Sequence, residues 1–108
     1  MPASYFIVLF DKPGNHRAGA YNRDIKRLSP LLPNITSAMI YLSRLMAKYR
    51  EPGFFMRIDK GKRMNPVAYA DLNEYGGIVR FKDKDGYHWS PAISLAEFRQ
   101  KLARRVAH

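Results

Sequence analysis

Residues 4–10, SYFIVLF, contain the longest strongly apolar run of the chain and are rich in β-branched and aromatic side chains. The turn-forming residues DKPG, 11–14, follow directly. A short apolar run of this kind predicts a strand that is buried on both faces, near the centre of a sheet. The run has about a third of the length of a membrane span, so we expect neither a transmembrane helix nor a secretory signal.

A helix is predicted after a long loop. Residues 11–33 show no sustained period and contain several Pro and Gly residues, which predicts a loop with a short turn of helix near Asp24–Leu28. Apolar side chains then recur at helical spacing, at Ile35, Met39, Leu42, Leu45, Met46 and Tyr49. Thr36 is the expected N-cap of this helix. The residues EPG, 51–53, are expected to end it.

Strands are predicted in the second half of the chain. Gly53–Asp59 alternates between apolar and mixed positions, which is typical of a half-buried strand. Val67–Leu72 is a weaker candidate. Ile78–Lys82 and Tyr87–Ser90 flank the residues DKDG, 83–86, and this pattern predicts a hairpin.

A terminal helix completes the predicted fold. Ser94 and Glu97 have the spacing of a capping box, and Leu95, Phe98, Leu102 and Val106 then form an apolar face. The expected class is α+β, with an antiparallel sheet of four to five strands, two helices packed on one face and the order β-loop-α-β-β-β-β-α. Either three or four strands lie between the two helices. The 108 residues are expected to form a single domain.

The order of these elements is similar to that of a known family. From Thr36 onward, the order helix, three strands, helix resembles that of double-stranded-RNA-binding domains. Those domains have a lysine-rich motif at the start of their last helix, where the side chains contact phosphate and the helix dipole favours its negative charge. Here the first turn of that helix contains Leu95, Ala96 and Glu97. The resemblance is one of element order, and it assigns no family.

The charge of the chain indicates the kind of partner. It has 19 Lys and Arg against 9 Asp and Glu, a formal charge of +10. We therefore expect a nucleic acid or an acidic protein surface as the partner. Without cysteine there is neither a disulfide framework nor a thiolate metal site, which is consistent with the expected reducing, cytoplasmic location.

The candidate binding residues come from three segments. In the predicted helix, Ser37, Tyr41, Arg44 and Lys48 are spaced to form one stripe on the side away from the core. The early loop and the basic turn after Asp59 supply the others. We expect the cations to meet phosphates, and Tyr21 or Tyr41 to stack on an exposed base. The full set is Arg17, Tyr21, Arg23, Tyr41, Arg44, Lys48, Lys60, Lys62 and Arg63.

The sequence contains no recognisable motif for cofactor or metal chemistry. The three histidines are far apart in sequence, which gives no local support for a zinc site. Asp83 and Asp85 lack the other ligands of a calcium-binding loop. Gly61 and Lys62 lack the remaining residues of a phosphate-binding loop. We therefore expect no cofactor and no metal.

Three functions are compatible with these features. The first is a non-enzymatic module that binds the phosphate backbone of DNA or RNA. The second is an accessory or inhibitor protein, of the kind that phages and mobile elements encode, which binds an acidic or nucleic-acid-binding surface of a host protein. The third is a small metal-independent ribonuclease, in which Tyr87 and His88 would act near Arg57 or Arg80.

Overall fold

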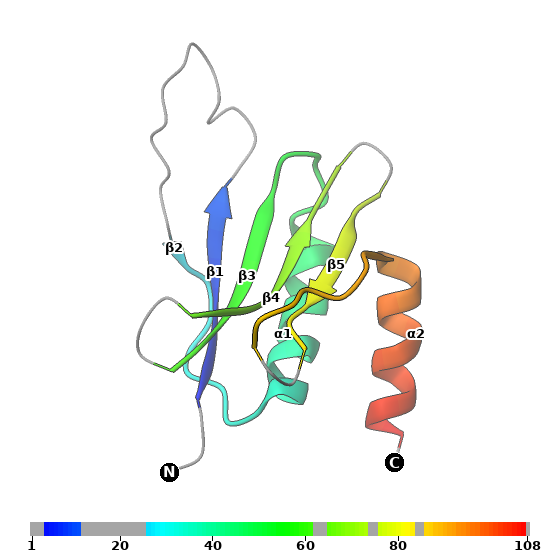
Figure 1. The fold of residues 1–108 in the computed structure, drawn as a ribbon. Coiled ribbons are helices and arrows are strands. Elements are labelled where there is room, and N and C mark those ends of the chain that lie inside the picture. Colours follow the sequence, from blue (N-terminus) through cyan, green and yellow to red (C-terminus); the bar gives the residue numbers. More distant parts are fainter. Residues whose placement is uncertain (1–3, 12–25, 62–64, 74–75, 84–85, 108) are drawn as a thin grey trace.

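The computed structural model describes residues 4–11, 26–61, 65–73, 76–83 and 86–107. The described residues form six strands and two helices (Figure 1). The α+β class is confirmed, with six strands rather than four to five. In chain order the elements are β1 (Tyr5–Asp11), β2 (Lys26–Arg27), α1 (Ile35–Lys48), β3 (Phe55–Lys60), β4 (Pro66–Asp71), β5 (Ile78–Phe81), β6 (Ile93–Ser94) and α2 (Leu95–Val106).

The strands form one sheet in the order β2-β1-β3-β4-β5-β6, and every neighbouring pair is antiparallel. The first strand of the chain, β1, lies between β2 and β3. Ile7, Val8 and Leu9 in β1 are all buried, which confirms the prediction of a strand buried on both faces. The helical turn expected near Asp24–Leu28 is wrong where that segment is described, because Lys26 and Arg27 pair with β1 as β2.

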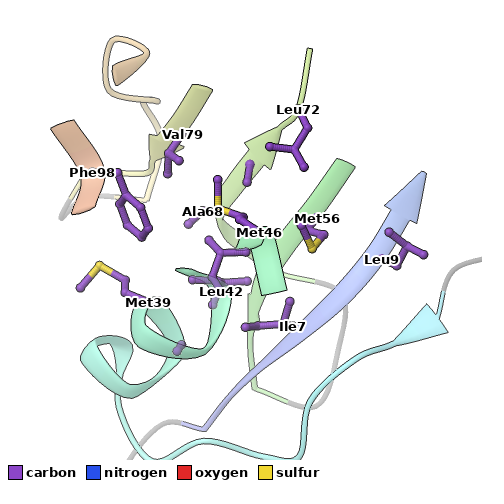
Figure 2. Close-up of a cluster of buried hydrophobic side chains, with 13 residues drawn as sticks. Ile7, Leu9, Met39, Leu42, Met46, Met56, Ala68, Leu72, Val79 and Phe98 are labelled. Atoms are coloured by element: carbon purple, nitrogen blue, oxygen red, sulfur yellow. The ribbon is translucent and has the colours of Figure 1, made fainter. Parts of the chain in front are cut away.

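Both helices pack on the same face of the sheet. Figure 2 shows side chains from α1, α2 and the strands pointing toward one another in this layer. The buried core cluster consists of Ile7, Leu9, Ala38, Met39, Leu42, Met46, Met56, Ile58, Ala68, Ala70, Leu72, Val79 and Phe98. Among the described residues, no helix is long and apolar enough to cross a membrane.

The helices begin at polar caps. Asn34 is the N-cap of α1, and its side-chain oxygen accepts a hydrogen bond from the Ser37 N–H at 2.8 Å. The expectation for Thr36 is wrong, since Thr36 lies inside the helix and its Oγ1 accepts from Arg105 Nε at 2.8 Å. At the start of α2, Ser94 Oγ accepts from the Glu97 N–H at 3.1 Å, so the predicted Ser94 cap is confirmed.

The opposite face of the sheet has a row of aromatic rings. Phe10 contacts Phe55 at a centroid distance of 5.6 Å, and Phe55 stacks on Tyr69 at 5.0 Å. Trp89 packs against Tyr69 at 5.0 Å, and the segment that follows β5 crosses in front of the sheet in Figure 1. Because the rings contact one another across strands, they stabilise the sheet and cover part of this face.

The predicted hairpin has only one regular arm. Ile78–Phe81 form β5, but in place of a second strand at Tyr87–Ser90 there is a single bridge between Lys82 and Trp89. Ser90 accepts from the Phe81 N–H through its Oγ at 3.0 Å and donates its own N–H to the Phe81 carbonyl at 2.7 Å. The strand that pairs with β5 after this segment is β6.

Gly77 is expected to be more sensitive to substitution than its neighbour Gly76. Its φ is +117°, and an added Cβ would lie 2.8 Å from Leu72 Cδ2 and 3.3 Å from the Asp71 carbonyl oxygen. Gly76 has a φ of +110°, but no atom of the described residues lies within 4 Å of its added Cβ. Gly76→Ala should therefore lose about 1 kcal/mol of unfolding free energy from the backbone alone. Gly77→Ala should lose about 2 kcal/mol or more, because the buried Leu72 must also move. Urea denaturation measures both losses, and equal losses would contradict the close contact.

Candidate functional site

The predicted binding residues fall into two groups. Arg17, Tyr21, Arg23, Lys62 and Arg63 lie outside the described residues. Tyr41, Arg44, Lys48 and Lys60 lie within them.

The described members of the predicted set have different surroundings. Arg44 and Lys48 are exposed on α1, whereas Tyr41 is half-buried and packs against the core cluster. The ring of Tyr41 is therefore part of the packing under α1. Lys60 is exposed at the end of β3 and lines a different groove from Arg44. The structure thus keeps Arg44 and Lys48 together on α1 and places Lys60 elsewhere.

The two helices run antiparallel. Arg105 in the last turn of α2 donates to Thr36 in the first turn of α1. The C-terminal half of α1 consequently lies beside the N-terminal half of α2. This arrangement brings Arg99 near side chains that lie about fifty positions earlier in the chain.

Three arginines line one groove between these helix halves. Arg44 comes from α1, Arg50 follows the end of α1, and Arg99 comes from α2. We call this cleft the arginine groove. Its volume is about 700 Å³, and its lining residues are Ser43, Arg44, Met46, Ala47, Arg50, Leu72, Gly76, Leu95 and Arg99. None of these described lining residues is acidic, so no carboxylate among them neutralises the three guanidinium groups.

The arginine side chains are exposed, and one is fixed by a local bond. Arg50 Nε donates to the Ala47 carbonyl at 2.7 Å, which satisfies a carbonyl at the C-terminal end of α1. The guanidinium groups of Arg44 and Arg99 are exposed on the two helices that flank the cleft. Guanidinium groups have a planar array of donors that matches the oxygens of phosphate. The donors that line the groove are therefore of the chemical type that suits phosphate oxygens.

Positive charge is concentrated in the helical layer. Residues of α1 and α2 include six cations and only one carboxylate, Glu97, a formal charge of +5. The six strands include five cations and three carboxylates, a formal charge of +2. The surface formed by the two helices is consequently the more favourable one for a polyanion.

One ion pair lies in the sheet itself. Arg57 donates to Asp59 Oδ2 at 3.1 Å, and the two side chains are 12% and 0% exposed. Burial raises the pKa of Asp59 above its ordinary value, and the Arg57 charge and hydrogen bond oppose this rise. Within the described structure, Arg57 Nε and Asp59 Oδ1 are buried without a hydrogen-bond partner. The pair is inaccessible to a large ligand, so we assign it to the fold.

The residues of the possible ribonuclease site lie on an exposed turn. Tyr87 is 83% exposed, His88 is also exposed, and their backbone N–H groups donate to Asp83 Oδ1. Arg57 is paired with Asp59, as described above. Arg80 donates to the Ser90 carbonyl at 2.8 Å and to the Tyr69 hydroxyl at 3.3 Å. Arg57 and Arg80, the two cations expected near this site, therefore form hydrogen bonds with other residues of the protein.

Neither a group of metal ligands among the residues that the structure describes nor a known relative assigns the protein to a class. Within the described residues, no three His, Asp or Glu side chains are grouped so that they could hold a metal ion. Comparison with protein-family models, with curated proteins and with solved structures found no match. The order helix, three strands, helix, on which the resemblance to double-stranded-RNA-binding domains rested, is wrong, because four strands (β3 to β6) lie between the two helices. The class defined by fold and surface is a small basic α+β domain.

Proposed function

We propose that this protein binds nucleic acid through its helical layer, with phosphate contacts centred on the arginine groove. The observation that supports this most is the convergence of Arg44, Arg50 and Arg99 on one cleft that has no acidic side chain among its described lining residues. Lys48 lies one turn from Arg44 on the exposed side of α1 and extends the basic surface along that helix.

The proposed contact is to the phosphate backbone. Exposed arginines on two helix surfaces are suited to a row of phosphates, whereas sequence-specific contact needs side chains that reach base edges. Tyr41 is packed against the core cluster, so stacking on that ring has no part in the proposal. Arg17, Arg23, Lys62 and Arg63 remain predicted additional contacts.

The proposal predicts binding that weakens steeply with salt. Each neutralised phosphate releases a counterion, so the logarithm of the binding constant should fall linearly with the logarithm of the salt concentration. Replacing Arg44 and Arg99 together with Gln should reduce the slope by about 2, close to 0.9 for each lost phosphate contact in duplex DNA. Fluorescence anisotropy with a labelled DNA duplex and a labelled single-stranded RNA, titrated at several salt concentrations, measures this slope.

A matched variant controls for total charge. Lys26→Gln/Arg27→Gln removes the same two charges from β2 at the edge of the sheet. This variant should keep the wild-type slope. Equal losses in both double variants would show that the arginine groove has no special role. If neither oligonucleotide binds the wild-type protein at low salt, the proposed function is wrong, and an acidic protein surface becomes the partner to test.

A further inference from the structure

A second groove lies at the other half of the helix pair. It is bounded by the N-terminal half of α1, by α2, and by residues of β4 and β5. Its volume is about 830 Å³. We call it the apolar groove, because half of its lining residues are apolar or aromatic: Tyr5, Ile35, Met39, Val67, Phe81, Ile93, Phe98 and Leu102.

The apolar lining is continuous with the protein core. Met39 and Phe98 belong to the buried core cluster and also line the groove, and Figure 2 shows them at one end of that cluster. Phe81, Ile93 and Leu102 are partly buried and pack against the same cluster. A ligand in the groove would therefore remove apolar side chains from water, which favours binding of an apolar chain.

Four cations also line the apolar groove. Lys60 comes from β3, Lys82 follows β5, and Lys101 and Arg105 lie one turn apart on α2. Arg105 uses its Nε–H for Thr36, so its terminal nitrogens lie beyond that bond and can donate to an anion. In the apolar groove, these cations stand beside a largely apolar lining. The arginine groove is smaller, with a volume of about 700 Å³.

Two carboxylates are present in the same lining. Asp83 accepts bonds from the backbone N–H groups of Tyr87 and His88, which hold it in the turn after β5. Glu97 lies one helical turn before Lys101 on α2 and is placed to offset that charge. Among the described lining residues, the cations thus exceed the carboxylates, and Lys60 and Arg105 approach the groove from different elements.

We propose that the apolar groove binds a long-chain carboxylate, with the chain on the apolar lining and the carboxylate among the cations. Charge complementarity selects an anionic head group over a neutral one. The volume of about 830 Å³ lies within the range of about 300–1,000 Å³ that is typical of small-molecule sites. The proposal is independent of the function assigned to the arginine groove, since the two clefts share no lining residue.

The test compares dodecanoate with dodecanol, both below the concentrations at which they aggregate. The probe signal is the methyl NMR spectrum, in which Ile35 and Ile93 line the groove and Ile7 of β1 lies in the core. Dodecanoate should shift the Ile35 and Ile93 signals in a saturable way. Dodecanol has the same chain without the charge and should bind at least about tenfold more weakly, since an ionised head group adds a charge-assisted contact.

Variants of the cations decide between specific and general binding. Lys60→Gln and Arg105→Gln should each weaken dodecanoate binding about fivefold and leave dodecanol binding unchanged. Arg44→Gln/Arg99→Gln removes two charges from the other groove and should not change dodecanoate binding. The proposal is overturned if dodecanoate causes no saturable shift, if dodecanol binds equally well, or if the Arg44/Arg99 variant weakens binding as much as the groove variants do.

Discussion

Replacing Phe98 by Ala is expected to lower the free energy of unfolding by about 4 kcal/mol, more than any of the other substitutions that we propose. Phe98 is 2% exposed and is the buried residue of α2. Its ring lies 5.9 Å from the ring of Phe81 and belongs to the core cluster between the helices and the sheet. Truncation would leave a cavity beneath α2 and remove the main apolar contact of that helix.

Chemical denaturation at equilibrium measures this loss. Phe98→Leu keeps most of the apolar volume and should lose less than half as much as Phe98→Ala. Val106→Ala removes apolar atoms from the same helix at a position that is 53% exposed, and it should change the free energy of unfolding by at most about 0.5 kcal/mol. Similar losses for Phe98→Ala and Val106→Ala would contradict the role of Phe98 as the anchor of α2.

The second large effect is expected at Asp59. Asp59→Leu removes the carboxyl group and leaves the Arg57 charge without its hydrogen-bond acceptor, in a site where Arg57 is only 12% exposed. Breaking a buried ion pair from one side is strongly destabilising, and we expect a loss of about 3 kcal/mol. Arg57→Met/Asp59→Leu removes both charges and should recover most of this loss, because a buried pair often contributes little net stability. Urea denaturation of the three proteins measures both effects, and a double variant as unstable as Asp59→Leu would contradict the explanation.

The same residue gives a defined dependence on pH. Because burial raises the pKa of Asp59 above 3.8, the native state binds its proton more tightly than the unfolded state does. The contribution of Asp59 to stability is therefore greatest below pH 3.8 and falls as the pH rises toward the native pKa. This fall should be absent in Arg57→Met/Asp59→Leu. The difference between the wild-type protein and this double variant in free energy of unfolding, measured as a function of pH, therefore gives the contribution of Asp59. Asp71, whose pKa is also raised by burial, is common to both proteins.

The long regular elements were predictable from sequence because their patterns are local. The run SYFIVLF and the alternation in Gly53–Asp59 correspond to β1 and β3, which differ from the predicted ranges only at their ends. The strands β2 and β6 have two residues each, too few for any period to appear. Their existence depends on the neighbouring strand that offers hydrogen bonds.

The cap of α1 shows a different reason for a wrong prediction. Asn34 and Thr36 are both good N-cap residue types, and the choice between them depends on where the chain turns. Here Asn34 has the extended backbone of a cap, with φ −153° and ψ 168°. The hydroxyl of Thr36 instead accepts a hydrogen bond from Arg105 of α2. A pattern of neighbouring residues cannot predict this contact, because the two residues lie far apart in the sequence.

The arginine groove was only partly predictable. Arg44 and Lys48 follow from helical spacing, whereas Arg50 and Arg99 join Arg44 only because the helices run antiparallel. That direction depends on the number of strands between the helices. An even number returns α2 antiparallel to α1, and an odd number would make the two helices parallel. From the sequence, either three or four strands were expected between the helices. The fourth strand is β6, which consists only of Ile93 and Ser94, and its presence makes the helices antiparallel.

The position of β1 in the sheet has a consequence for synthesis of the chain. Tyr5 pairs with Lys60, so β1 leaves the ribosome before β3 and has to wait for it before its longest ladder can form. By contrast, β3 to β6 follow one another along the chain and pair in that order. Among the described strands, β1 therefore waits through the longest stretch of chain for its main partner, which makes the apolar run SYFIVLF the natural target for a chaperone and a candidate for aggregation if elongation stalls.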